Sequence, residues 1–325
     1  MGIVADSIYK KKVVHRYDGE DYIKYFTSSD FDGLLSDPYS FMSGKNRLNG
    51  SFYYYPGFIS DTLIIFCHGI GGGHLSYMTE IEYLCRLGYR VFAYDNTGCC
   101  ASGGSSIRGR TQALADLDAA LNALKTGGIY GRYKKVFVIG HSLGGYAAGN
   151  IPNYHSGLSG VVVISGYVSL EQVLRSEFGG PKGLINRYMF GKTLGFEAKA
   201  NPSYVFSSSL DAVNGAKTRF LIFHSEDDPV AVFSYHGGYL REHCVNSDAR
   251  FVIYKDRKHN PNYLPDARMY MEEVFSGFAG AVAQKKIRTE EEKKAFFANV
   301  DWLRMTRQDD SFWAEVSSFL SSADV

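Results

Sequence analysis

A serine that could act as a nucleophile stands between two glycines, in Gly140-His141-Ser142-Leu143-Gly144. The apolar run Val136–Ile139 before it predicts a buried strand, and the small residues of Gly144–Ala148 predict a helix after it. A serine on so sharp a strand-to-helix turn has a strained backbone, and its hydroxyl projects above the sheet edge. A glycine-rich loop with a capping serine is the competing interpretation, and the predicted strand and helix favour the nucleophile.

An acid and a base follow the ends of two later predicted strands. Ser225-Glu226-Asp227-Asp228 comes after one strand, and a loop that contains His259 comes after the next. A serine hydroxyl is a weak nucleophile unless a neutral imidazole, oriented by a carboxylate, takes its proton. Ser, then Asp, then His is the chain order of one of the convergent catalytic triads. Two alternatives stay open: His259 as a surface residue, and Asp227-Asp228 as the N-cap of the following helix.

A glycine-rich loop follows another predicted strand, in His68-Gly69-Ile70-Gly71-Gly72-Gly73-His74. Its backbone N–H groups are free to point at one spot. We expect the N–H of Ile70, with Gly71 as the next choice, to form an oxyanion hole with the N–H of Leu143. The spacing fits neither common phosphate-binding motif, and the five cysteines lack zinc-site spacing. We therefore expect no metal and no cofactor.

Strands and helices alternate from Thr62 onward, which predicts an α/β fold with a mainly parallel sheet and helices on both faces. In such sheets functional groups gather beyond the carboxyl ends of the strands. The expected strands are 62–67, 90–94, 135–139, 161–165, 219–224 and 251–254, and the expected helices are 75–87, 112–125, 144–150 and 233–243. Before them we expect early strands at 13–17 and 50–55, with a loop over 30–46.

Two segments interrupt the alternation within what we interpret as a single domain, 1–325. Residues 166–218 predict a small helical cap over Ser142, and residues 262–308 predict a second helical insertion before a terminal helix at 310–320. The cap offers aromatic and apolar candidates for the wall of an acyl pocket: Tyr167, Phe178, Tyr188, Met189 and Phe190. Packing of the cap onto the core explains the same residues equally well.

The sequence resembles the α/β-hydrolase superfamily, over about residues 62–259. The resemblance rests on His68-Gly69, on the turn Asp95-Asn96-Thr97-Gly98-Cys99-Cys100-Ala101-Ser102-Gly103, on Gly140-His141-Ser142-Leu143-Gly144, on His224-Ser225-Glu226-Asp227-Asp228 and on His259. In the family's D-x-x-G-x-G-x-S turn, Cys100 replaces the second glycine. The resemblance implies an α/β-hydrolase fold, with Ser142 as nucleophile, Asp228 as acid and His259 as base.

Two further points follow from the resemblance. Asp227 is held in reserve as the acid, and His68 and His74 are less suited as bases because they precede the nucleophile. The elbow around Ser142 is similar to that of serine aminopeptidase-like and related acyl hydrolases.

These residues suggest acyl transfer on a small molecule. The leading hypothesis is hydrolysis of a carboxylic ester or thioester through an acyl-enzyme. A second is an aminopeptidase-like amide hydrolase, in which a cap carboxylate (Glu171, Glu177 or Glu197) would receive a substrate ammonium. A third is a non-catalytic binding protein on the same fold.

The composition limits the classes of binding partner that we expect. Lys and Arg total 35 against 34 Asp and Glu, so that the net charge is +1, and this balance argues against nucleic acid and anionic membranes as partners. We find no apolar run long enough to span a bilayer and no leader-like pattern, and we expect a cytoplasmic protein. The sequence makes no prediction about the oligomeric state.

Overall fold

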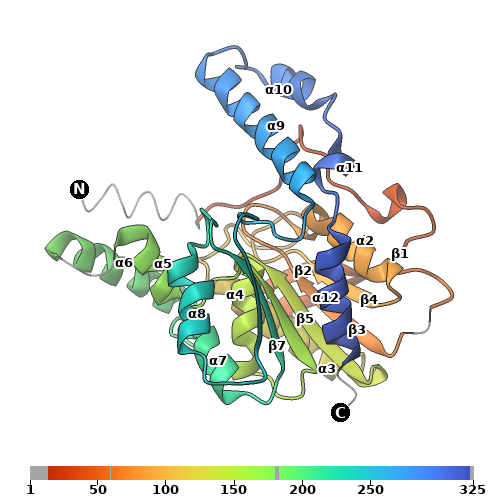
Figure 1. Ribbon diagram of the computed structural model, residues 1–325, viewed down its shortest axis with the longest axis vertical. Coiled ribbons are helices and arrows are strands. Elements are labelled where there is room, and N and C mark those ends of the chain that lie inside the picture. The colour runs from red at the N-terminus through yellow and green to blue at the C-terminus, as the bar shows by residue number, and fades with distance from the viewer. Residues whose placement is uncertain (1–13, 59, 180–182, 323–325) are drawn as a thin grey trace.

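An eight-stranded, mostly parallel sheet forms the centre of the protein (Figure 1). The structure is a computed structural model that describes residues 14–58, 60–179 and 183–322. The strand order is β1-β2-β4-β3-β5-β6-β7-β8, with β1 and β2 antiparallel to their neighbours and the others parallel. The strands are β1 (Leu35–Ser43), β2 (Asn46–Tyr54), β3 (Thr62–Cys67), β4 (Arg90–Tyr94), β5 (Lys135–His141), β6 (Gly160–Ile164), β7 (Phe220–Ser225) and β8 (Arg250–Tyr254). The predicted strands from Thr62 onward are confirmed.

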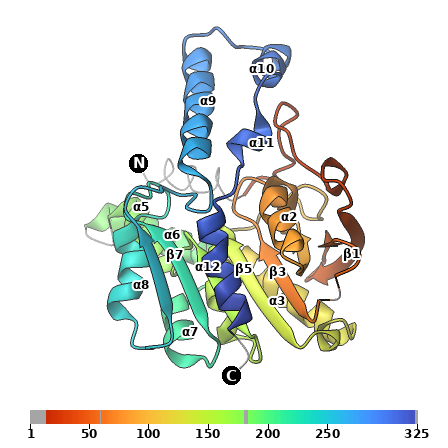
Figure 2. The same ribbon diagram turned by 45° about the vertical axis from the view of Figure 1, so that its right-hand side comes forward.

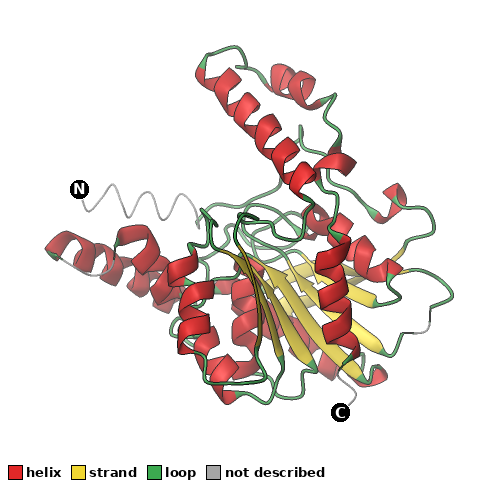
Figure 3. Ribbon diagram, viewed as in Figure 1, coloured by secondary structure: helices red, strands yellow, loops and turns green. Residues whose placement is uncertain are grey.

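Helices cover both faces of this sheet (Figures 1 and 3). One face packs against α3 (Gln112–Thr126), α4 (Leu143–Asn150), α7 (Ser209–Gly215) and α8 (Gly237–His243), and the other against α2 (Met78–Arg86) and α12 (Asp310–Ser321). Successive strand residues alternate between the two cores, as Ile64 and Ile65 do, because side chains point to opposite faces of a strand. Strands β3, β5, β6 and β7 are therefore mainly apolar and buried, as expected of a sheet covered on both sides, whereas β1 carries polar residues and is exposed over residues 35–38.

The two segments outside the alternation are helical. Residues 166–218 contain α5 (Leu170–Phe178), α6 (Leu184–Ala200) and α7, and residues 262–308 contain α9 (Pro265–Ala283), α10 (Glu290–Phe297) and α11 (Trp302–Met305). In Figures 1 and 2, α9 and α10 project away from the end of the sheet. Short 3-10 turns occur at Ser28–Asp30, His74–Tyr77, Tyr130–Arg132, Ile151–Asn153 and Phe233–Tyr235. Across the described ranges, no helix has both the length and the hydropathy to cross a membrane.

The N-terminal part differs from the sequence-based expectation. The loop prediction over 30–46 is wrong, because β1 occupies residues 35–43 and pairs with β2. Pro38 lacks an N–H, but β1 lies at the edge of the sheet, where one side needs no partner. The strand expected at 13–17 is not formed over its described residues, which contain only an isolated bridge between Tyr17 and Cys99. The backbone of Tyr17 forms its hydrogen bonds with the turn after β4. Val13 lies outside the described residues.

Candidate active site

Ser142 occupies the sharp turn between β5 and α4. Its backbone has φ 56° and ψ −117°, a left-handed conformation that is strained for a residue with a Cβ. The two flanking glycines make this turn possible, because a Cβ on Gly140 would overlap the Gly144 carbonyl and a Cβ on Gly144 would overlap the Cys67 carbonyl. The Ser142 N–H donates to the Ile164 carbonyl at 2.9 Å, which ties the turn to β6. The strained turn that the motif predicts is present.

Asp228 and His259 form a close pair beyond the ends of β7 and β8. The His259 Nδ1 lies 2.8 Å and 3.0 Å from the two carboxylate oxygens of Asp228, whose side chain has no exposed surface. The N–H groups of Val230 and Ala231 also donate to Asp228, at 2.8 and 2.9 Å. Burial opposes ionisation, but the hydrogen bond and charge of His259 outweigh it, and the pKa of Asp228 is below its usual value. An ionised Asp228 holds the His259 proton on Nδ1 and leaves Nε2 as the acceptor.

Asp227, the alternative acid, faces elsewhere. One of its carboxylate oxygens accepts hydrogen bonds from the Ser225 hydroxyl at 2.6 Å and from the Lys258 N–H at 2.9 Å. Its role in these bonds is to hold the loop after β8. The geometry therefore favours Asp228 over Asp227 as the partner of His259.

His259 lies near Ser142 through a ring contact with His141. The rings of His141 and His259 pack with centroids 4.8 Å apart, and His141 directly precedes Ser142. Among the hydrogen bonds of the described residues, none joins Ser142 to His259; such contacts are often long without substrate. The Ser142 side chain lies instead beside the Tyr167 hydroxyl.

The two N–H groups expected to form an oxyanion hole belong to Ile70 and Leu143. Leu143 is the first residue of α4, so its N–H has no partner within the helix. Gly69 brings the loop against Ser142, since a Cβ on Gly69 would lie 3.3 Å from the Ser142 Cβ. Ile70 and Leu143 line the same cavity. This placement suits donors aimed at an oxyanion next to Ser142.

Sequence reasoning missed a buried bridge that involves His141 and Tyr77. The Gly69 N–H donates to the Tyr77 hydroxyl at 3.0 Å, this hydroxyl lies 2.9 Å from the His141 Nδ1, and the His141 Nε2 lies 2.9 Å from the His259 carbonyl oxygen. Burial, with a further effect of His259, lowers the pKa of His141 to about 3 and keeps its ring neutral. Only the position of His141 next to the serine could have hinted at this bridge.

A cavity of about 670 Å³ lies next to the Ser142 turn, with Leu143 and Tyr167 in its wall; Ser142, Asp228 and His259 are not among the residues that line it. Its wall is formed by His15, Tyr17, Ile70, Gly71, Arg110, Leu143, Tyr167, Val173, Ser176, Glu177, Pro229, Val230, Val232 and His236. Tyr167 is the one residue of the expected pocket wall that lines it. Phe178 and Phe190 pack in a small cluster within the cap, Met189 is buried, and Tyr188 is 52 % exposed. The structure does not bring these four to the cavity.

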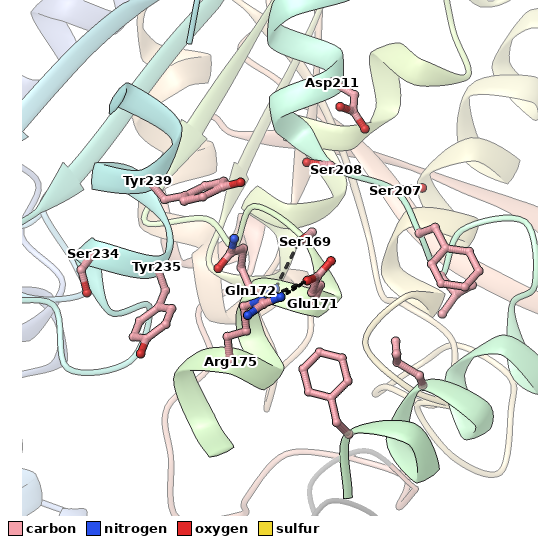
Figure 4. A pocket seen from close by; sticks show the side chains of 14 residues that line it. Ser169, Glu171, Gln172, Arg175, Ser207, Ser208, Asp211, Ser234, Tyr235 and Tyr239 are labelled. Atoms are coloured by element: carbon pink, nitrogen blue, oxygen red, sulfur yellow. Dashed lines mark hydrogen bonds and ion pairs between the residues drawn. The ribbon is translucent and has the colours of Figure 1, made fainter. Parts of the chain in front are cut away.

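The three acidic residues of the cap all accept hydrogen bonds from other residues. Glu177 lines the cavity and accepts from Arg110 at 2.6 and 3.3 Å. Glu197 is fully buried and accepts from the N–H groups of Arg110 and Thr111. Glu171 lines a different cavity, of about 600 Å³, and pairs there with Arg175 at 2.6 Å (Figure 4).

The two histidines of the glycine-rich loop are buried and hold the loop in place. His68 lies 2.7 Å from the Gly69 carbonyl through Nδ1 and accepts the Asn96 N–H through Nε2 at 2.9 Å. His74 bonds Asp95 at 2.7 Å and the Tyr53 hydroxyl at 2.8 Å. Both rings are thus engaged away from Ser142.

Comparisons with known proteins agree with this architecture. Residues 64–200 match the family described as the alpha/beta hydrolase family, and no curated protein matches the chain. Among solved structures, the chain is similar to an esterase from Pyrococcus furiosus, with a TM-score of 0.58 and 18 % identity over 83 % of this chain and 98 % of that one.

Two other solved structures share the fold. The Pyrococcus horikoshii acylaminoacyl peptidase has a TM-score of 0.54 at 15 % identity, over 77 % of this chain and 42 % of that one. Est1E from Butyrivibrio proteoclasticus, with ferulic acid bound, has a TM-score of 0.54 at 16 % identity, over 75 % of this chain and 99 % of that one. The eight-stranded sheet and these shared folds show that the chain has the α/β-hydrolase fold, and its residues 64–200 match the alpha/beta hydrolase family.

Proposed function

We propose that the protein is a serine hydrolase that cleaves a carboxylic ester or thioester through an acyl-enzyme. The observation that carries this proposal is the strained Ser142 turn beside a buried Asp228–His259 pair. A backbone held at φ 56° is costly, and such strain concentrates at functional sites. The 2.8 Å contact between Asp228 and His259 supplies the oriented imidazole that a serine nucleophile needs.

The proposed reaction has two acyl-transfer steps. The Ser142 Oγ attacks the substrate carbonyl while His259 Nε2 takes the hydroxyl proton, and the N–H groups of Leu143 and Ile70 bind the oxyanion. His259 then gives this proton to the departing alkoxide or thiolate, which leaves Ser142 acylated. A water molecule, deprotonated by His259, attacks the acyl-enzyme; the carboxylic acid leaves, and the proton returns to Ser142.

The cavity favours an ester over a substrate with a free ammonium group. An aminopeptidase needs a carboxylate available to that ammonium, and Glu177 is the acidic residue in the cavity wall. Its two bonds to Arg110 already balance its charge. Glu197 and Glu171 are engaged elsewhere.

The test combines turnover with covalent labelling. A panel of p-nitrophenyl acyl esters of increasing length, run beside aminoacyl anilides, should show ester hydrolysis that disappears in Ser142→Ala. A fluorophosphonate probe should add one adduct, at Ser142, and none to the variant. Preference for the anilides would support the peptidase alternative. An absence of both turnover and labelling would support the non-catalytic alternative and contradict the proposal.

A further inference from the structure

Tyr167 connects the cavity wall with Ser142. It follows β6, it lines the cavity, and its hydroxyl lies close enough to the Ser142 hydroxyl to interact with it. Within the described part of the chain, neither hydroxyl makes a hydrogen bond of normal geometry, and neither is among the polar side-chain atoms that are fully buried without a partner. Both oxygens therefore keep some exposed surface, and a molecule in the cavity can reach them.

The backbone around Tyr167 is fixed by the same turn that holds Ser142. The Ser142 N–H donates to the carbonyl of Ile164, the last residue of β6, at 2.9 Å. Gly166 then lies directly against Gly145 in the first turn of α4, because a Cβ on Gly145 would come within 2.8 Å of the Gly166 Cα. A movement of Tyr167 relative to Ser142 would therefore have to break this contact between the end of β6 and the start of α4.

The Tyr167 side chain is held as a neutral donor. Its ring packs edge to face against His236, with centroids 5.1 Å apart. The next residue is fixed as well, since the Val168 N–H donates to His236 Nδ1 at 3.4 Å and the Val168 carbonyl accepts from the Asn150 side chain at 3.2 Å. Burial raises the pKa of Tyr167 above its usual value, so the hydroxyl keeps its proton in ordinary buffers. Tyr167 thus presents an O–H donor beside Ser142.

A donor at this place is next to the charge that forms during acyl transfer. When the Ser142 Oγ bonds to a carbonyl carbon, the negative charge moves to the carbonyl oxygen, which a single atom separates from Oγ. We expect that oxygen near the N–H groups of Ile70 and Leu143, which line the same cavity as Tyr167. Hydrogen bonds to an ionised oxygen are roughly twice as strong as those between neutral groups, so a neighbouring hydroxyl stabilises this state most.

We propose that Tyr167 is a catalytic residue whose hydroxyl donates a hydrogen bond to the oxyanion, as a third donor beside the N–H groups of Ile70 and Leu143. This inference rests on the proposed serine hydrolase function. No atom is transferred in this contact, because the Ser142 proton still passes to His259 and Tyr167 keeps its own. Tyr167 therefore stabilises the tetrahedral state more than the bound ester, and loss of its hydroxyl should lower kcat more than it changes KM.

The experiment compares turnover with the binding of two ketones. Tyr167→Phe retains the ring that packs on His236 and removes the hydroxyl alone. On a p-nitrophenyl ester, we expect kcat per labelled active site to fall about 10- to 100-fold, with KM within about twofold of wild type. An alkyl trifluoromethyl ketone, whose carbonyl Ser142 attacks to form an oxyanion adduct, should bind more weakly by a similar factor. The methyl ketone with the same alkyl chain is hardly attacked and should bind as in wild type.

Tyr235→Phe is the matched control, because Tyr235 lines the separate cavity of Figure 4. It should leave kcat and both inhibition constants as in wild type. An unchanged kcat in Tyr167→Phe would overturn the inference, and so would an unchanged affinity for the trifluoromethyl ketone or an equal loss of affinity for both ketones. The hydrolase proposal would survive each of these results, because it depends on turnover and Ser142 labelling in wild type. Absence of both in wild type would overturn the two proposals together.

Discussion

The His141 Nε2 lies 2.9 Å from the backbone carbonyl oxygen of His259 and donates a hydrogen bond to it. The same ring accepts the Tyr77 hydroxyl proton at Nδ1, and Tyr77 accepts the Gly69 N–H. One chain of buried hydrogen bonds thus connects the loop of the proposed oxyanion donor with the loop of the proposed base. The relative position of the two loops depends on the Tyr77 hydroxyl.

Tyr77→Phe should therefore reduce catalysis more than substrate binding. Removal of the hydroxyl leaves the Gly69 N–H and the His141 Nδ1 without their partner, at a cost of about 1–3 kcal/mol in folding stability. We expect kcat to fall about tenfold with a smaller change in KM, measured on a p-nitrophenyl ester. Tyr83→Phe, in the helix α2 that follows Tyr77 but with its hydroxyl on Asp310, is the control and should keep wild-type kinetics. Equal kcat in Tyr77→Phe and wild type would remove the positioning role.

Substitution of Asp228 should reduce kcat far more than substitution of its neighbour Asp227. Asp228→Asn retains the shape of the side chain but no longer favours the His259 tautomer with its proton on Nδ1, and such changes in a triad reduce kcat by about 10⁴-fold. Asp227→Asn disturbs the bonds to Ser225 and Lys258 and should reduce kcat by less than about tenfold. Steady-state kinetics of the two variants measure this. The opposite order would make Asp227 the acid.

Two buried histidines should make the protein lose stability in acid. Burial is the main cause of the low pKa of His141 and His236, each about 3, while the ordinary value is 6.5. Below pH 6.5 the unfolded chain binds protons at these residues and the native state does not. The free energy of unfolding therefore decreases as the pH is lowered from 6.5 to about 3. Each histidine contributes a slope of about 1.4 kcal/mol per pH unit.

Urea denaturation between pH 6.5 and pH 4 measures this slope. His236→Phe removes one of the two groups and should flatten the dependence by about 1.4 kcal/mol per unit, whereas His243→Phe should retain it. A slope that is unchanged in His236→Phe would contradict the assignment of a neutral buried ring.

Cys100 stands where the family's turn has a glycine, and the backbone there is left-handed, with φ 42°. Cys100→Gly should remove about 1 kcal/mol of backbone strain from the native state. The greater freedom of glycine in the unfolded chain costs a similar amount, so the free energy of unfolding should change by less than about 1 kcal/mol. Gly98→Ala, in the same turn, should be destabilised by more than this, because its Cβ would overlap the carbonyl of Ser106. Thermal denaturation compares the two, and similar losses in both would contradict the account.

Local patterns in the sequence predict the strands and the residues at their ends. Ser142, Asp228 and His259 each follow an apolar run, and parallel strands bring such ends to one edge. β1 was missed because its pattern, with Asp37 and Pro38, is that of a loop and only pairing with β2 makes it a strand. The bridge between Tyr77 and His141 could not have been found in this way, because the two residues are far apart in the chain and only the fold brings them together.

The buried carboxylate of Glu197 joins α6 to the start of α3. Thr111, the N-cap of α3, has no capping bond from its own side chain, and its N–H and hydroxyl both donate to Glu197, at 3.2 and 2.5 Å. Movement of α6 away from the sheet would thus expose the first turn of α3 and separate an ionisable group from its donors. The amide protons of Arg110 and Thr111 should accordingly exchange with solvent only when much of the chain unfolds, and we expect any substrate to reach Ser142 without a swing of α6.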